Sequence, residues 1–576
     1  MHKPAPENPY KQMRKNKLTH LLFLFSLLSV LAFFTFYPFR IDLTEDGRYS
    51  LSPYTIQLIK NVNRPIRFTV YLNGDLNPAF HRLRKATIDI VDDVSKYANH
   101  SVSTTYINPA QAGSEEERLQ AFGDLAARGL IPTEVYMRDK DGKSIRHVIF
   151  PWIEIEVDGQ KVAVPLLKNL RNKSGEENIN ISIENLEFEL ADALRRLTVK
   201  TVRRIAFLEG HGELSEAETY EITKSLSRYY QIDRGALNED ASVLNDYPLV
   251  IVAGPQTAFS EEDKYILDQY IMYGGSLLWL VDGVKYDKQQ LTDIGFTPVI
   301  EADLNLQDLF FRYGIKINPV LIQDLQCINI PVNIAPQGEQ AQFDWMPWHY
   351  APLLLSSDLH PVSKNTAEIL SEFVSGISMV GQPLTTKTEV LLASSRQSKI
   401  ATAPAIVSLH AAEDTDPDTF NASHLPVAVM VSGNFQSNFN NRIPPSGIRT
   451  ERPFKSNSDF TRQLFIAGSS IIRNETTGTA SDSTCLPLGY DRATGFTHGN
   501  ETFLVNAVHY LTHQEEWIQL REKSIKIRLL NQQLSLQKKT SLQIIHIALP
   551  VVCLFLFAFV FNHYRKKKYA HKSVQD

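Results

Sequence analysis

The chain has 576 residues, of which 43% are hydrophobic and 21% are charged. The composition excludes wholesale disorder, and the length is enough for roughly four domains at about 150 residues each. Three cysteines exclude a disulfide scaffold and a cysteine-rich metal array, and the formal net charge of −5 excludes a generally basic nucleic-acid binder.

Positive charge is concentrated at the two ends of the chain. Residues 1–17 and residues 562–576 each sum to +4, which leaves −13 for the span between them. Each basic end adjoins an uncharged stretch, 22 residues at 18–39 and 18 residues at 544–561. Because about 20 apolar residues cross a bilayer core as a helix, both stretches predict transmembrane helices.

The basic ends also predict the topology. The positive-inside rule places both termini in the cytoplasm and the roughly 500 residues between them on the other face of the membrane. A cleaved signal peptide is the alternative for 18–39, but no small-residue cleavage site follows and the apolar run exceeds the usual length of about 7–15 residues. A buried core helix is the alternative for 544–561, and the basic run after it argues against that alternative.

Residues 40–175 predict an N-terminal α/β module. Helical patterns occur at 79–98 and after Ser114, whose spacing to Glu117 is that of a capping box. Strand patterns occur at 66–72, 101–107, 133–137, 144–150 and 152–157. The order β-α-β-α-β-β suggests a thioredoxin-like arrangement, and it lacks a redox CxxC motif because no cysteine precedes Cys327.

Residues 176–515 predict a second, auxiliary α/β module. Strands and helices alternate in its first half, which predicts a doubly wound, mostly parallel sheet. The expected helices are 178–197, 215–229, one that starts at Ser260, 306–313 and 503–511. The expected strands are 204–208, 249–253, 276–281, 427–431 and 464–467, with a loop at 345–348. Residues 516–543 predict a helical stalk that leads into the second span.

The most site-like motif is Glu209-Gly-His211-Gly-Glu213, which follows the strand predicted at 204–208. Doubly wound sheets bind ligands at the carboxyl ends of their strands, and His211 could act there as a metal ligand or general base. The alternative is a turn in which the glycines permit positive φ and His211, on the surface, forms local hydrogen bonds. We favour the turn, so these three residues are predicted only as a ligand or partner loop.

No motif predicts catalysis, a metal or a cofactor. Nucleophilic catalysis in such a sheet needs Ser or Cys at a strand-to-helix elbow, whereas Gly254-Pro-Gln-Thr257 follows the strand predicted at 249–253. A P-loop, an HExxH motif and a glycine-rich dinucleotide fingerprint are absent from the sequence. Cys327 and Cys485 would share an oxidising compartment if the body is periplasmic, and the sequence leaves open whether they pair.

Several short motifs follow one another in a specific order. They are Arg40-Ile-Asp-Leu-Thr-Glu45, Arg48-Tyr-Ser-Leu-Ser-Pro53, Phe207-Leu-Glu-Gly-His-Gly-Glu213, Gly274-Gly-Ser-Leu-Leu-Trp-Leu-Val-Asp282, Tyr313-Gly-Ile-Lys-Ile-Asn318, Pro487-Leu-Gly-Tyr490 and Gly499-Asn-Glu-Thr-Phe-Leu-Val-Asn506. In this order the chain resembles the gliding-motility-associated auxiliary, or substrate-binding, proteins of Bacteroidota ABC transporters, the GldG-like family.

The resemblance implies a membrane-anchored periplasmic protein that works with an ABC permease and a separate ATP-binding subunit. It also implies a second module similar to the class I glutamine-amidotransferase fold without a catalytic nucleophile. Relatives tend to carry Asp-rich residues where Ser469 and Ser470 stand here, so a cation or ligand role of that loop is not carried over from the resemblance.

We therefore expect a non-catalytic, membrane-anchored accessory subunit of an ABC transporter associated with gliding motility. Its expected partners are the permease, the ATP-binding subunit, membrane lipid and an envelope component, and not nucleic acid. Two alternatives stay open: a periplasmic solute-binding receptor with the loop 209–213 at its rim, and an envelope hydrolase that uses His211 with a carboxylate.

Overall fold

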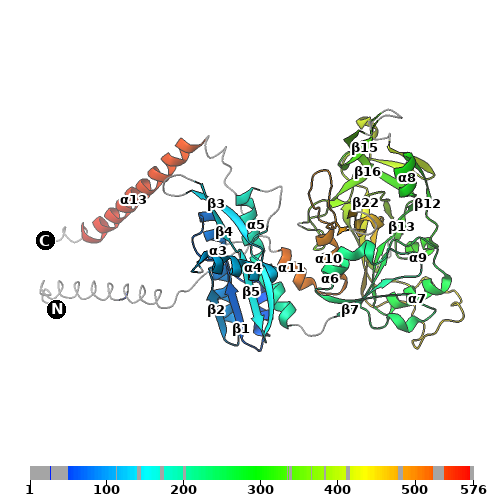
Figure 1. Ribbon diagram of the computed structural model, residues 1–576, viewed down its shortest axis with the longest axis horizontal. Helices are drawn as coiled ribbons and strands as arrows, with labels where there is room; N and C mark the ends of the chain where they lie inside the picture. The colour runs from blue at the N-terminus through cyan, green and yellow to red at the C-terminus, as the bar shows by residue number, and fades with distance from the viewer. Residues whose placement is uncertain are drawn as a thin grey trace, which may run out of the picture. The chain divides into compact units, whose positions relative to one another are not determined.

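The computed structural model describes most of the chain, which forms two compact units, Met1–Ser524 and Ile525–Asp576 (Figure 1). The described residues are 26, 50–111, 113–138, 144–168, 174–198, 203–333, 335, 340, 342–364, 366–381, 385–409, 416–477, 484–522 and 538–570. The predicted span at 18–39 lies outside the described residues except for Ser26.

An N-terminal sheet of four strands has the order β2-β1-β5-β6. Its strands are β1 (Ile66–Val70), β2 (Val102–Tyr106), β5 (Trp152–Val157) and β6 (Gln160–Pro165). β1 is parallel to β2 and antiparallel to β5, with Phe68 opposite Ile155. β1 alternates buried and more exposed residues, as a half-buried strand does.

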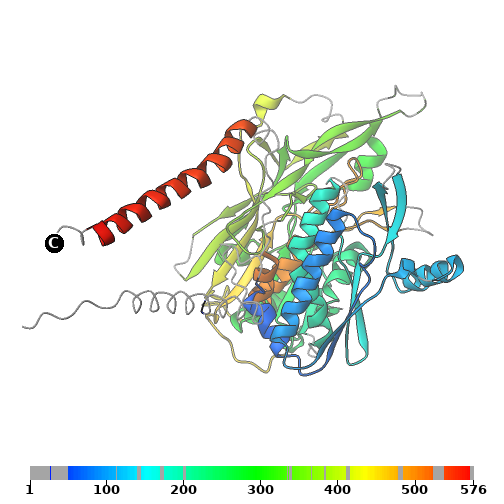
Figure 2. The same cartoon turned by 90° about the vertical axis from the view of Figure 1, so that its left-hand side faces the viewer.

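Two long helices cover this sheet. They are α3 (Pro78–Tyr97) and α5 (Gly175–Thr198), which lie side by side (Figure 2) and share one core with the strands. Asn77 caps α3 by accepting a hydrogen bond from the Phe80 N–H, and a proline follows at the first helical position. The short α2 (Pro53–Lys60) is capped by Ser52 in the same way.

The sequence predicted most of this module correctly. α4 (Glu115–Ala127) begins with the expected capping box, in which both reciprocal hydrogen bonds between Ser114 and Glu117 are present. β3 (Thr133–Arg138) and β4 (Ser144–Ile149) form a separate two-stranded hairpin. β6 was missed, because its short sequence QKVAVP ends in proline and carries only a weak strand signal.

The main sheet is mixed, which corrects the prediction of a mostly parallel one. Its strands run in the order β15-β16-β19-β22-β23-β10-β9-β7-β8, and β17 pairs with β16. The parallel strands are β7 (Arg203–Leu208), β8 (Tyr230–Gly235), β9 (Leu249–Ala253), β10 (Ser276–Leu280) and β23 (Thr461–Ile466). The antiparallel strands are β15 (Cys327–Asn333), β16 (Phe343–Ser356), β19 (Thr386–Ala393) and β22 (Pro426–Gly433).

The predicted loop at 345–348 is also wrong, since these residues lie inside β16. Pro347 ordinarily argues against a strand, because it cannot donate to a ladder. Here it stands in the arm where β16 pairs with β15, opposite Asn329, before β16 reaches β19 at Leu355. A proline is tolerated at such an edge position.

Both faces of the parallel strands are buried. Ile205 and Phe207 of β7 face one core with α6 (Tyr220–Leu226) and α10 (Asn500–Leu511), whereas Ala206 and Leu208 face a second core with α7 (Glu261–Met272) and α9 (Gln307–Arg312). This explains the nearly continuous apolar runs of these strands. The predicted helix at 215–229 is shorter than expected, because β8 starts at Tyr230.

Smaller elements surround the main sheet. The strands are β11 (Val284–Lys285), β12 (Phe296–Glu301), β13 (Ile315–Ile317), β14 (Val320–Asp324), β17 (Ile369–Leu370), β18 (Ile377–Met379), β20 (Ser398–Thr402), β21 (Ala405–Ser408), β24 (Thr476–Thr477) and β25 (Thr484–Cys485). α8 (Lys288–Ile294) lies between β11 and β12, and β11, β12 and β21 form one three-stranded sheet.

α11 (Glu515–Glu522) occupies the start of the predicted stalk and packs into the first unit through Trp517. The second unit contains α13 (Lys539–Ala570), whose stretch Gln543–Lys567 is long and apolar enough to cross a membrane and is unburied. Pro550 lies inside this helix. Among the described residues it is the one helix with these properties.

Candidate functional site

The carboxyl ends of β7, β9, β10 and β23 lie at one edge of the sheet, because these strands are adjacent and parallel. β7 lies between β8 and β9 in the sheet. The chain therefore adds β8 on one side of β7 and then returns to add β9 on the other side. The switch point of the sheet is therefore between β7 and β9. In open α/β sheets this is where ligands bind.

His211 lies at this switch point and is buried, with 6% of its surface exposed, so the expectation of a surface histidine is wrong. Its Nδ1 is 3.1 Å from Glu213 Oε1, and its Nε2 is 3.2 Å from Asp263 Oδ2. Its ring stacks on Phe259 at 3.7 Å between centroids. Both ring nitrogens face carboxylate oxygens, so both must donate, and the geometry requires the protonated imidazolium.

The same contacts explain the ionisation of the site. Burial disfavours the charged ring, but hydrogen bonds to Asp263 and Glu213 and their negative charges outweigh it and raise the pKa of His211 to about 9. The hydrogen bond from His211 lowers the pKa of Asp263 in return, against the effect of burial. The histidine is a fixed cation between two carboxylates at neutral pH.

The loop that carries His211 fills the switch point. The His211 carbonyl accepts hydrogen bonds from the N–H groups of Gln256 and Thr257, at 2.7 and 2.9 Å, in the loop after β9. Gly212 has φ of 72°, and a Cβ there would approach Gln256 Cβ at 3.1 Å. Glycine is needed because the two loops touch. The crevice expected between β7 and β9 is closed by the chain itself.

The three predicted site residues have different surroundings. Glu213 is joined to His211 twice, since its Oε2 also accepts from the His211 N–H at 2.7 Å. Glu209 lies apart from this pair, and its carboxylate is 3.4 Å from Arg234 Nη1. Asp263 was not predicted, although the Ser260 cap predicted the helix start that carries it. The long sequence separation between His211 and Asp263 hides their pairing.

Among the described residues there is no group of three or more His, Cys, Asp or Glu side chains placed to hold a metal. Cys327 Sγ lies 3.6 Å from His349 Nδ1, but burial raises the pKa of this thiol to about 12, which keeps it protonated. His349 Nδ1 is also 3.0 Å from the Asp324 carbonyl, a contact that its N–H makes as donor. Cys327 and Cys485 are free thiols.

One strand further along the edge there is an open cavity of about 440 Å³, here called the carboxyl-edge crevice. It is lined by Gln256 after β9, Asp282 after β10, Arg473 beyond β23, residues 284–288, and Pro298 and Ile300 of β12. The volume is in the range of small-molecule sites. No residue of the predicted loop 209–213 lines it.

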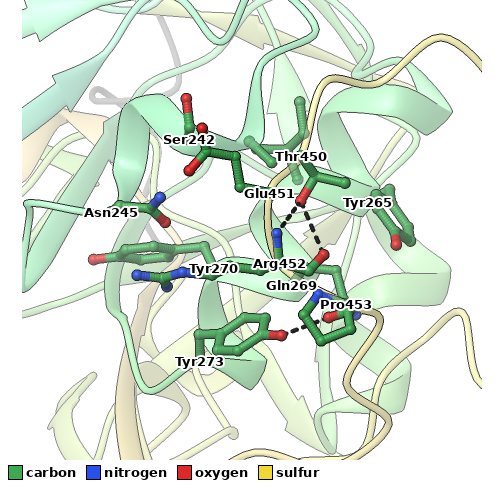
Figure 3. Close-up of a pocket in the computed structure, with 12 residues that line it drawn as sticks. Ser242, Asn245, Tyr265, Gln269, Tyr270, Tyr273, Thr450, Glu451, Arg452 and Pro453 are labelled. Atoms are coloured by element: carbon green, nitrogen blue, oxygen red, sulfur yellow. Dashed lines mark hydrogen bonds between the residues drawn. The ribbon is translucent and has the colours of Figure 1, made fainter.

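A second concavity lies beside α7 and is too small for a ligand. Its volume is about 20 Å³, and the segment Thr450–Pro453 covers it (Figure 3). Arg452 stacks 4.9 Å above the Tyr273 ring, and the Tyr273 hydroxyl donates to the Pro453 carbonyl. This segment is packed onto α7 and closes the space.

An α/β body whose switch point is closed by its own loops is the class of protein that these residues define. Residues 202–507, more than half of the chain, match the family model described as an ABC-type uncharacterized transport system, an auxiliary family. The chain belongs to this family of ABC transport auxiliary proteins. A domain of unknown function matches residues 45–156.

The individual proteins that resemble this chain have low sequence identity to it. An uncharacterized protein of Borreliella burgdorferi is 23% identical over 448 residues, which cover 75% of this chain and 78% of that protein. The solved N-terminal domain of mmIFT52 is 14% identical, with a TM-score of 0.30, over 54% of this chain and 97% of that domain.

Proposed function

We propose that the chain is a non-catalytic, membrane-anchored accessory subunit that works with an ABC permease and a separate ATP-binding subunit. In this proposal residues 18–39 and 544–561 are inner-membrane spans, both termini are cytoplasmic, and residues 40–543 are periplasmic. Membership of an ABC transport auxiliary family supports the accessory role. The apolar helix α13 supports the second span.

The observation that carries the proposal is the junction between the two ends of the periplasmic part. Tyr54 of α2 and Trp517 of α11 are in edge-to-face contact, with ring centroids 5.7 Å apart. Phe188 of α5 also packs against Trp517, at 4.9 Å. The chain leading from the first predicted span and the chain leading to the second therefore meet at one place on the body.

This junction has a mechanical consequence. Trp517 is 2% exposed and also lies 4.9 Å from the Arg195 guanidinium. The apolar cluster joins α2, α5 and α11, and Tyr229 of the main body packs against it. A movement of either span would thus reach both modules through one packed cluster. An accessory subunit that follows the conformation of a permease needs such a connection.

The finer assignments are part of the proposal. The ordered motifs support a GldG-like subfamily and a role in gliding motility. The order of strands supports a thioredoxin-like N-terminal module, and the parallel half of the main sheet supports an amidotransferase-like module at 176–515. α5 packs onto the N-terminal sheet and contributes to its core. A module boundary at residue 175 therefore separates α5 from the core to which it belongs.

Co-purification tests the proposal. The full chain, tagged at its C-terminus, is isolated in mild detergent from native membranes, and its partners are identified by mass spectrometry. We expect an ABC permease and an ATP-binding subunit in constant proportion. A control chain that lacks residues 544–576 should lose them. Recovery of the chain without either subunit, under conditions that preserve other transporters, would contradict the proposal.

A second candidate function is reception of a small solute, and the carboxyl-edge crevice favours it. The hydrolase alternative has no comparable support, since His211 is held as a cation by two carboxylates and so cannot act as a general base.

A further inference from the structure

The acidic groups of the carboxyl-edge crevice already have donors within the chain. Asp282 accepts two hydrogen bonds from Ser469, one from its N–H at 2.7 Å and one from its hydroxyl at 2.5 Å. Asp287 accepts from the Gln290 N–H at 3.0 Å and thereby caps α8. Neither carboxylate needs an added cation to satisfy it.

Two of the three cationic groups have weaker partners or none among the described residues. Lys288 forms an ion pair with Glu372. Arg473 Nε is buried without a hydrogen-bond partner in the described part of the chain, and its ion pair with Glu218 is long, at 3.7 Å. Lys285 is exposed and has no ion-pair partner in the described part of the chain. The positively charged groups of the crevice therefore have hydrogen-bond donors left for an anion.

The strand β12, next to Lys285 in the small sheet, presents an apolar row. On β12, Thr297 and Val299 are buried, whereas Phe296, Pro298 and Ile300 point outward. Ile300 is 53% exposed and lies directly opposite Lys285 in the antiparallel register with β11. A cation and a branched apolar side chain thus stand side by side on one face of the small sheet.

The apolar surface continues beyond the crevice. Pro298 lies opposite Ile406 of β21, which is 72% exposed. A single exposed branched side chain is common on protein surfaces. Here Ile406 extends the apolar row formed by Ile300 and Pro298. A ligand with its anionic group near Arg473 and Lys285 would lay its apolar part along this row.

The formal charges select the kind of anion. Lys285, Lys288 and Arg473 line the crevice together with Asp282 and Asp287, and Lys288 is paired with Glu372. A monoanion needs only Lys285 and Arg473, whereas a phosphate dianion would also meet the carboxyl oxygens of Asp282 and Asp287. The planar guanidinium of Arg473 also matches a carboxylate in a bidentate geometry.

We propose that the carboxyl-edge crevice binds a carboxylate joined to a branched apolar group of about the size of a leucine side chain. The carboxylate pairs with Arg473 and Lys285, and the apolar group packs on Ile300 and Pro298. The source of the carboxylate is a free acid or the C-terminal end of a peptide. This inference deepens the receptor function and is independent of the accessory role.

Direct binding to the full chain in lipid nanodiscs tests the inference. The probes are 4-methylpentanoate, N-acetyl-alanyl-leucine and, as the uncharged match of the peptide, N-acetyl-alanyl-leucinamide. Binding is measured by saturation-transfer NMR and calorimetry. We expect dissociation constants of about 1 mM or tighter for one or both acids, and binding at least about tenfold weaker for the amide. The preferred acid distinguishes the free acid from the peptide end.

Variants locate the binding. Arg473→Gln and Ile300→Asn should each weaken binding of the acids by about tenfold. The first substitution removes a charge-assisted pair, and the second removes the apolar contact. Lys316→Gln, which changes an exposed lysine on β13, should leave binding unchanged and is the matched control. Circular dichroism of each variant checks folding.

Three outcomes would overturn the inference: no binding of either acid, equal binding of the amide, or binding that Arg473→Gln and Ile300→Asn leave unchanged. Stronger competition by inorganic phosphate than by the acids would also overturn the choice of a carboxylate. The co-purification experiment reads out the accessory role separately, because permease capture does not depend on these probes.

Discussion

Replacement of His211 by glutamine removes a buried cation but keeps a side chain that can hydrogen-bond. The pKa of His211 is raised from its ordinary value of about 6.5 to about 9. A protonated His211 stabilises the folded state. This stabilisation is fully present below about pH 6.5, the pKa in the unfolded chain, and it is lost as the pH rises through about 9, the pKa in the folded chain. The shift corresponds to about 3 kcal/mol at the acidic end and to about 2 kcal/mol near pH 7.5.

Urea unfolding of the full chain in nanodiscs, followed at several pH values, measures this effect. The wild type should lose stability relative to His211→Gln between about pH 6.5 and pH 9.5, and the two chains should converge above that range. His81→Gln, an exposed histidine on α3, is the control and should follow the wild type. A constant difference between wild type and His211→Gln across this range would refute the reasoning.

Three further predictions concern packing and reactivity. Trp517→Ala should cost about 3–5 kcal/mol and expose the amides of α2 and α11 to hydrogen exchange, whereas Trp345→Ala, at a side chain that is 47% exposed, should not. Gly254→Ala should lower the unfolding midpoint more than Gly159→Ala, because both have positive φ but only the first places a Cβ 2.9 Å from another side chain. Iodoacetamide should alkylate Cys327 far more slowly in the folded chain than in urea, since burial raises its pKa to about 12, and equal rates would contradict this.

Local signals in the sequence were enough to predict the elements that have strong caps or continuous apolar runs. The Ser114 capping box and the Ser260 cap both form, and the apolar strand β9 is buried throughout. Each of these features depends on residues within a few positions of one another. The same locality explains why the glycines around His211 predicted a tight loop correctly.

Long-range pairing was beyond the sequence pattern. The antiparallel half of the main sheet pairs strands separated by long loops, so its direction is set by tertiary packing that periodicity does not report. The contact between His211 and Asp263 joins a loop to the first turn of α7, 52 positions further along the chain. The carboxyl-edge crevice combines Gln256, Ile300 and Arg473 from three segments that are far apart in the sequence, so no sequence motif could predict it.

Labelling with a membrane-impermeant maleimide tests the central claim most directly. In a chain whose three cysteines are replaced by serine, single reporters are introduced as Lys85→Cys, Lys15→Cys or Lys567→Cys. The account predicts that, in intact spheroplasts, the reagent labels the reporter at position 85, and that the other two react only after the membrane is permeabilised. Labelling of the position 85 reporter only after permeabilisation, together with those at 15 and 567, would place the body in the cytoplasm and contradict the account.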